Sequence, residues 1–114
     1  MKNRGKSSRK AIKREGRFFV YIVQCRDGTY YTGYTQNLEE RVSLHNSGKG
    51  AKYLRGRLPV KLVYAKEYRY YKNVLSAERR IKELTRQQKS KLVRSYAENS
   101  RNNEASDLFG RERQ

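Results

Sequence analysis

The sequence is poor in the residue types that cross-link or interrupt small proteins. It has one cysteine (Cys25), one histidine (His45), one proline and no tryptophan. A single cysteine and a single histidine cannot build a disulfide framework or a structural zinc site. Acidic residues are also scarce, since 11 Asp and Glu stand against 28 Lys and Arg. The composition therefore excludes the disulfide-rich and zinc-stabilised classes of small protein.

Long hydrophobic runs are missing as well. No apolar segment is long enough to cross a bilayer, and no apolar region of the secretory type follows the basic N-terminus. We therefore expect no membrane span, no secretory signal and a cytoplasmic location. The formal charge of +17 points instead to a polyanionic partner such as nucleic acid, whose binding weakens as salt is added.

The apolar residues concentrate in the middle of the chain. Nineteen of the 22 Leu, Ile, Val and Phe residues lie between positions 18 and 93, together with nine of the ten tyrosines. A chain of 114 residues has room for one domain. We predict that this domain spans 17–96, between a basic flexible arm over 1–16 and a flexible polar tail over 97–114.

Local signals give the order of the expected elements as β-β-α-β-α-α. Apolar runs, turn residues and helix caps place strands at 18–25, 29–35 and 60–65, and helices at 37–45, 73–84 and 86–96. The caps are Asn37 with Glu40, and Thr85 with Gln88. The fold class is therefore α/β (α+β), with a small, mainly antiparallel three-stranded sheet flanked by helices.

Two of the predicted helices carry a charged residue on the side that should face the core. Arg41 lies beside Leu38 and Val42 on the first helix, and Glu78 falls inside the apolar stripe of the second. A carboxylate facing a core must be paired, protonated or bound to a cation. Arg41 could extend its charge to water, Glu78 could pair with Arg41, and His45 could be a hydrogen-bonded core residue. The other interpretation is a functional site, because local conflicts with folding rules gather there.

The tyrosines are the third unusual feature, since ten Tyr stand against three Phe. Tyrosine packs in cores where its hydroxyl finds a partner, stacks on bases, and offers a phenol for proton transfer. Tyr21 and Tyr31 stand out because the two strands of one hairpin carry them.

Taken together, these residues resemble the GIY-YIG nuclease superfamily, and most of all its small single-domain bacterial members. The resemblance covers about residues 18–93 and rests on five segments: Phe19-Val20-Tyr21, Tyr31-Thr32-Gly33, the helix with Arg41, the basic loop 48–60 and the helix with Glu78. Phe19 and Val20 replace the Gly and Ile of the first motif. The family's late asparagine has no clear counterpart among Asn99, Asn102 and Asn103.

The resemblance implies a metal-dependent endonuclease that hydrolyses phosphodiester bonds in nucleic acid, in DNA rather than RNA. Glu78 would hold one divalent cation, Mg²⁺ by preference. Arg41 would neutralise the phosphate with its planar fork. Tyr21 would orient or deprotonate the attacking water, with its pKa lowered from about 10 by the cation and Arg41. Tyr31 and His45 would support it.

By the same resemblance, four side chains of the basic loop would contact phosphates elsewhere on the strand: Lys49, Lys52, Arg55 and Arg57. A rival interpretation comes from composition alone, because small basic proteins commonly bind RNA. It is a non-catalytic nucleic-acid-binding module, associated with RNA or the ribosome.

The register of the first hairpin decides between the two interpretations. A two-residue turn at Asp27-Gly28 suits the sequence well and would put Tyr21 and Tyr31 on opposite faces of the sheet. A three-residue loop would put both tyrosines on one face and set Gly33 opposite Tyr21. A shared site requires this second register, so we predict that both tyrosines point the same way, with Arg41 and Glu78 close to them.

Overall fold

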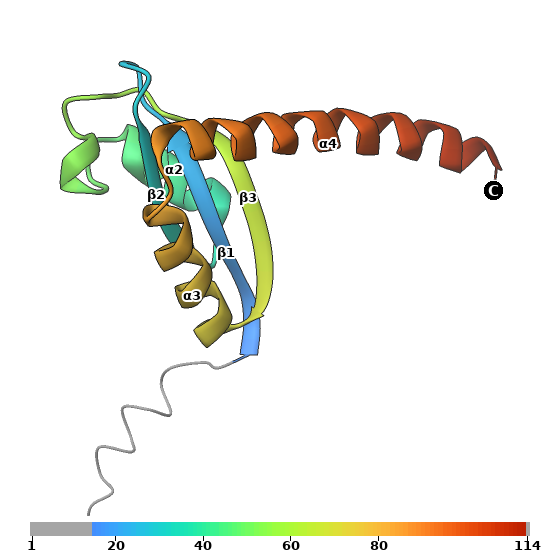
Figure 1. Cartoon of the computed structure of the whole chain (residues 1–114), viewed down its shortest axis with the longest axis horizontal. Helices are drawn as coiled ribbons and strands as arrows, with labels where there is room; N and C mark the ends of the chain where they lie inside the picture. Colours follow the sequence, from blue (N-terminus) through green and yellow to red (C-terminus); the bar gives the residue numbers. More distant parts are fainter. Residues whose placement is uncertain (1–14, 114) are drawn as a thin grey trace, which may run out of the picture.

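The core of the protein is a three-stranded antiparallel sheet. The computed structural model describes residues 15–113, with side chains as far as residue 101. The strands β1 (Glu15–Gln24), β2 (Tyr30–Thr35) and β3 (Lys61–Tyr70) are arranged in the order β2-β1-β3 (Figure 1). Because β1 is the central strand, β2 and β3 form the two edges.

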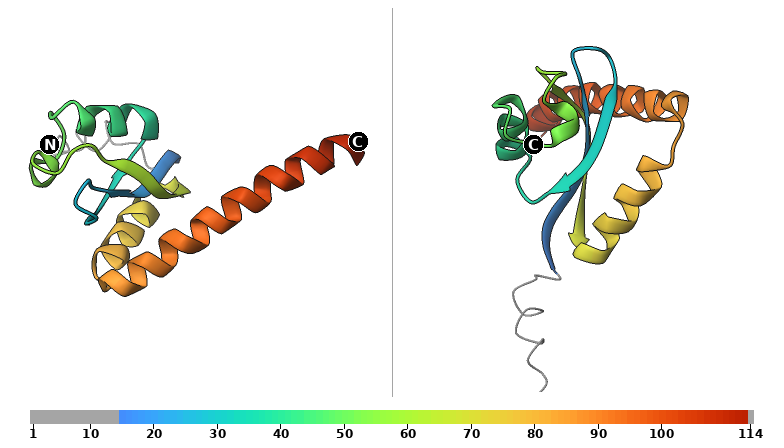
Figure 2. Two further views of the ribbon diagram at one scale, coloured as in Figure 1. Left: turned by 90° about the horizontal axis from the view of Figure 1, so that it is seen from above. Right: turned by 90° about the vertical axis from the view of Figure 1, so that its left-hand side faces the viewer.

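Helices cover both faces of this sheet. The chain continues from β2 into α2 (Leu38–Asn46) and the short 3-10 helix η1 (Lys52–Leu54), and from β3 into α3 (Tyr71–Lys82) and α4 (Arg86–Arg113). Figure 2 shows α2 on one side of the sheet and α3 with the beginning of α4 on the other. The predicted order β-β-α-β-α-α and the α+β fold class are therefore confirmed.

Alternating side chains of β1 supply two separate hydrophobic clusters. The cluster on the α3 side consists of Phe18, Val20, Ile22, Val74, Ala77 and Ile81. The cluster on the α2 side consists of Tyr21, Val23, Cys25, Leu54 and Val60. A strand with both faces buried lacks an alternating polar side, which is why this segment is continuously apolar in the sequence.

Both predicted helix caps are present. The Asn37 side chain accepts a hydrogen bond of 3.0 Å from the backbone N–H of Glu40, and α2 follows it. At the start of α4, the N–H of Thr85 donates to the Gln88 side chain at 2.9 Å, and the N–H of Gln88 donates to the Thr85 hydroxyl at 3.1 Å. These contacts satisfy backbone donors that the first turn of a helix cannot pair internally.

The outer strand β3 is longer than predicted. β3 was expected to end at residue 65, but it continues to Tyr70. Its charges pair with the start of β1, where Glu67 meets Arg17 at 2.8 Å and Arg69 meets Glu15 at 2.6 Å. Cross-strand ion pairs of this kind stabilise an exposed ladder in place of apolar contacts.

The helices after β3 also depart from the expected bounds. α3 begins at Tyr71 instead of residue 73, and the Tyr71 ring packs against Phe18 at 5.5 Å between centroids. α4 continues to Arg113, although we expected a loose polar tail over 97–114. Most of its polar residues belong to types that a helix accepts at little cost.

The predicted basic arm over 1–16 lies largely outside the described residues. Its last two positions, 15 and 16, belong to β1. Within residues 15–113, no helix combines the length and apolar composition that crossing a bilayer would require.

Two buried threonines of β2 offer a matched test of the packing. Thr35 exchanges hydrogen bonds with the backbone of Asn37 at 3.1 and 3.2 Å, whereas the hydroxyl of Thr32 has no partner within residues 15–101. Since an unpaired buried hydroxyl is costly, Thr32→Val should raise the free energy of unfolding by about 1 kcal/mol, and Thr35→Val should lower it by about as much. Urea unfolding measures both changes, and a loss of stability in Thr32→Val would contradict the prediction.

Candidate active site

The hairpin between β1 and β2 adopts the register that a shared site requires. Tyr21 lies opposite Gly33, and Val23 lies opposite Tyr31. The N–H of Cys25 donates to the carbonyl of Thr29 at 2.8 Å, which leaves three residues in the loop. Directly opposed residues share a face, so Tyr21 and Tyr31 lie on the same side of the sheet. The two-residue turn that the Asp-Gly pair favours does not form.

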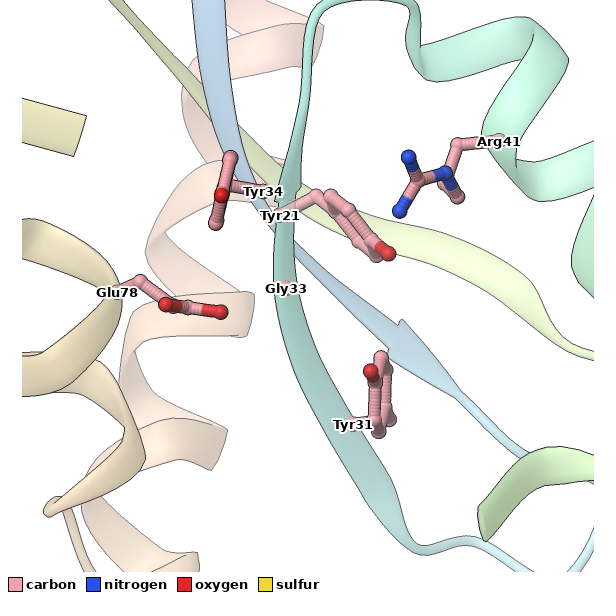
Figure 3. Close-up of a pocket in the computed structure, with 6 residues that line it drawn as sticks. All are labelled: Tyr21, Tyr31, Gly33, Tyr34, Arg41 and Glu78. Atoms are coloured by element: carbon pink, nitrogen blue, oxygen red, sulfur yellow. The ribbon is translucent and has the colours of Figure 1, made fainter. Parts of the chain in front are cut away.

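The predicted site residues meet at a pocket of about 260 Å³ on the edge strand β2. It is lined by Tyr21, Tyr31, Gly33, Tyr34, Arg41 and Glu78. Figure 3 shows Glu78 on one side of β2, and Arg41 and Tyr21 on the other, with Gly33 on the strand between them. The pocket therefore combines side chains from both faces of the sheet.

His45 sits behind the pocket and contacts Tyr21. Its Nε2 lies 2.8 Å from the Tyr21 hydroxyl oxygen, and its Nδ1 accepts a hydrogen bond of 3.3 Å from the N–H of Ala51. An Nδ1 that accepts leaves the proton of the neutral ring on Nε2, so His45 donates to Tyr21. The Tyr21 hydroxyl can therefore donate a hydrogen bond to another group in the pocket.

The ionisation of Tyr21 differs from what we expected. Burial raises the pKa of Tyr21 to about 12, with a further increase from Tyr31, while the positive charge of Arg41 lowers it. The protein's own groups therefore do not produce the expected fall below about 10, because the cost of burying a phenolate exceeds the help from Arg41. At neutral pH the phenol is protonated.

Space for the Tyr21 phenol depends on the glycine across the ladder. A Cβ atom at Gly33 would lie 2.7 Å from the Tyr21 hydroxyl oxygen and 2.9 Å from the ring carbon that bears it. Contacts that short are repulsive, so the second motif needs glycine here for steric reasons rather than for backbone freedom.

Glu78 and Arg41 do not neutralise one another. The Glu78 carboxylate pairs with Lys82 of its own helix at 3.3 Å, and within residues 15–101 it forms no ion pair with Arg41. A structural salt bridge therefore does not explain these two charges at the pocket. Arg41 contacts no carboxylate in the described part of the chain and faces the pocket with its charge available to an anion.

The pocket suits a cation that keeps most of its own water. Glu78 is the one carboxylate that lines it, and its side chain is 18% exposed. No cluster of three or more His, Cys, Asp or Glu residues that could enclose a metal occurs within the described residues. One carboxylate plus water is a donor set typical of Mg²⁺.

The four basic side chains of the loop fall into two groups. Lys49, Lys52 and Arg55 are exposed. Arg57 instead donates to the Asp27 carboxylate and lies over the ring of Tyr53. Three of the four predicted phosphate contacts thus remain open to solvent, and the fourth has partners within the protein.

Sequence reasoning missed one residue of the pocket, Tyr34. Its hydroxyl lies 3.2 Å from that of Tyr71, and this hydrogen bond raises the pKa of Tyr34. Its position directly after Gly33 is a signal that could have identified it. Because neighbouring side chains of a strand alternate between faces, however, Tyr34 was expected on the face opposite Gly33. The edge position of β2 lets it reach the same pocket. Asn99 lies on the exposed surface of α4 and does not line this pocket.

The titration of His45 tests this geometry directly, because the chain has a single histidine. Burial and the charge of Arg41 lower the pKa of His45 from 6.5. An NMR pH titration of its ring protons should therefore give a midpoint below 6.5, which moves up in Arg41→Ala and stays in place in Arg94→Ala. Because the unfolded chain binds this proton first, stability should fall as the pH drops from 6.5 to the folded pKa. A wild-type midpoint above 6.5 would contradict the contacts described here.

Known proteins resemble the chain in both sequence and structure. The family model of the GIY-YIG catalytic domain matches residues 17–91. A UPF0213 protein of Streptococcus pneumoniae is 48% identical over 75 residues, which cover 66% of this chain and 76% of the relative. A UPF0213 protein of Clostridium perfringens is 52% identical over 77 residues, which cover 68% and 83%.

A solved structure shares the fold. The solution NMR structure of the protein EF2693 from E. faecalis has a TM-score of 0.51 and 33% sequence identity, over 75% of this chain and 92% of that one. The family match spans β1 to the first turns of α4, and so contains every residue that lines the pocket. The chain therefore belongs to the GIY-YIG family, in its branch of small bacterial proteins.

Proposed function

We propose that this protein is a metal-dependent endonuclease that hydrolyses phosphodiester bonds in DNA. The observation that carries the proposal is the pocket itself, where an arginine with no carboxylate partner in residues 15–101, a partly buried carboxylate and three phenols meet at an open sheet edge. Phosphodiester hydrolysis needs neutralisation of phosphoryl oxygens, a positioned water and stabilisation of the leaving oxygen. The family contributes the reaction class, since the GIY-YIG domain is a nuclease domain.

Arg41 is the group that binds the scissile phosphate. Its side chain extends from α2 to the pocket and has no carboxylate partner within residues 15–101, so its planar fork can donate to two phosphoryl oxygens. Such charge-assisted hydrogen bonds strengthen as negative charge builds up on the phosphoryl group. Lysine at this position would supply the charge without the fork.

Tyr21 orients the attacking water. Its oxygen has two lone pairs, of which one accepts from His45, so the second can accept from water while the phenol donates its own proton. With a pKa of about 12, the resting phenol is not a base. Positive charge beside it, from Arg41 and from a cation that Glu78 would hold, lowers that pKa, so that the phenol can release its proton to solvent and the resulting phenolate can accept a proton from the attacking water.

Glu78 would hold the divalent cation, Mg²⁺ by preference. A cation bound there would supply Lewis-acid stabilisation of the phosphoryl and leaving oxygens. Lys82 pairs with Glu78 at the helix surface and is itself 54% exposed, so this contact is easily given up. Tyr34 also lines the pocket, where its hydroxyl would be available to hold water.

The basic loop contributes binding rather than chemistry. Lys49, Lys52 and Arg55 would contact phosphates on either side of the cleaved bond, and the formal charge of +17 would draw the polymer to the protein. DNA as the substrate, Mg²⁺ as the cation and a cytoplasmic location stay predictions of this proposal.

Incubation of the purified protein with supercoiled plasmid, single-stranded DNA and RNA tests the function. We expect nicking or linearisation of the plasmid with Mg²⁺ and none with a chelator, while gel shifts show binding in both conditions. Binding to all three polymers with no cleavage at any Mg²⁺ concentration would instead establish the non-catalytic basic module.

A further inference from the structure

Tyr31, which lines the pocket, packs against a side chain that lies outside it. Tyr53, in η1, stacks on the ring of Tyr31 with centroids 6.0 Å apart and an angle of 22° between the planes. On another side, the Tyr31 ring meets His45 edge-on at 5.7 Å and 75°. Tyr31 is therefore held between a core histidine and a residue of the basic loop.

Tyr53 is in turn fixed by Arg57. The guanidinium carbon of Arg57 lies 4.3 Å from the centroid of the Tyr53 ring, and its Nε donates to the backbone carbonyl of Tyr53 at 3.1 Å. A second guanidinium nitrogen donates to the Asp27 carboxylate at 2.6 Å. One arginine thus holds both the ring and the backbone of Tyr53, through a cation–π contact and a hydrogen bond.

Asp27 is itself rigid, because it closes the turn between β1 and β2. One of its oxygens accepts from the N–H of Thr29 at 3.1 Å and from the Thr29 hydroxyl at 2.7 Å, and the other faces Arg57. The N–H of Arg26 donates to the carbonyl of Arg57 at 2.9 Å, which ties the loop to the turn a second time. These contacts link Asp27 of the hairpin, through Arg57 and Tyr53 of the loop, to Tyr31 of the same hairpin.

These contacts argue against a direct role for the two loop residues in nucleic-acid binding. Arg57 donates to groups of the protein on two sides. Tyr53 as a whole residue is 45% exposed, but its ring already has an aromatic and a cationic partner, which compete with stacking on a base. Lys52 and Arg55, their neighbours, are exposed and have no ion pair within residues 15–101.

We propose that Tyr53 and Arg57 are positioning residues, which hold the Tyr31 phenol at the wall of the pocket. The kinetic consequence rests on the proposed nuclease function, whereas the position of the ring does not. By the family resemblance Tyr31 supports Tyr21, and a misplacement of about 1 Å at an active site can cost about a hundredfold in rate. Loss of the stack should therefore lower kcat and leave KM for DNA nearly unchanged.

The position of Tyr31 can be followed without any assay, through the His45 ring protons in the full chain. Tyr31 meets His45 edge-on, so movement of Tyr31 changes the ring current at His45. We expect Tyr53→Leu to shift the His45 signals, Tyr53→Phe to leave them unchanged, and Tyr70→Leu, at another exposed tyrosine, to have no effect. Unchanged His45 signals in Tyr53→Leu would overturn the proposal.

Plasmid cleavage supplies the second readout. Tyr53→Leu and Arg57→Ala should each lower kcat by about tenfold or more, Tyr53→Phe should restore it, and Arg55→Ala should act mainly on KM. An effect of Tyr53→Leu on KM alone would make Tyr53 a nucleic-acid contact and overturn the proposal. If the wild-type protein cleaves nothing, the proposed function fails, and the His45 signals still decide whether Tyr53 positions Tyr31.

Discussion

Glu78→Gln is expected to reduce plasmid cleavage at least about a hundredfold, which is the scale seen when one group that stabilises developing charge is removed. Glutamine keeps the shape of the side chain but lacks the negative charge that holds a divalent cation. DNA affinity in gel shifts should stay the same or rise slightly, because the substitution removes a negative charge from a basic protein. Raising the Mg²⁺ concentration should recover part of the lost rate.

Glu83→Gln is the matched control. Glu83 follows the last residue of α3 and does not line the pocket. Its substitution by glutamine removes the same charge as Glu78→Gln. Its cleavage rate should equal that of the wild type. Equal losses in both variants would show that the charge of the helix matters rather than a cation at Glu78, and full activity in Glu78→Gln would remove Glu78 from the mechanism.

Gly33→Ala should have the second large effect, on activity and stability together. A methyl group here would lie 2.7 Å from the Tyr21 oxygen, and Tyr21, only 1% exposed, has little free space into which to move. We expect a loss of about 1–3 kcal/mol in the free energy of unfolding, the usual cost of overfilling a packed site. Displacement of the phenol should lower kcat by about tenfold or more.

Gly56→Ala separates this clash from the general cost of replacing a glycine. A Cβ at Gly56 would have no heavy atom within 4 Å, so both stability and cleavage should stay near the wild-type values. In a Tyr21→Leu background, Gly33→Ala should cost much less stability, because the hydroxyl that it meets is gone. If Gly33→Ala costs as much stability in the Tyr21→Leu background as in the wild type, the strain does not come from contact with the Tyr21 hydroxyl.

The fold was largely predictable from sequence, because its signals are local. The continuous apolar run of β1, the Asn37 cap and the capping box at Thr85 each depend on neighbours a few residues away, and all three appear in the structure. The length of β3 was not predictable in this way. Glu67 pairs with Arg17, which lies 50 residues before it in the sequence, and no local pattern announces such a partner.

The site was predictable only in part. The register of the hairpin follows from a shared site at Tyr21 and Tyr31, although the Asp-Gly pair alone favours the other turn. The burial of Tyr21 could not be judged from the sequence, so the rise of its pKa among the protein's own groups was not predicted. The stack of Arg57 on Tyr53 is a tertiary contact within a loop whose composition suggests only phosphate binding.

The position of the pocket on an edge strand bears on how a very long polymer could reach it. β2 has β1 on one side and no strand of residues 15–113 on the other, so the pocket opens sideways. A continuous DNA molecule could then enter and leave laterally, without a free end to thread and without a domain that has to open. Circular and linear DNA should accordingly be equivalent substrates, and internal sites should be reached as readily as ends.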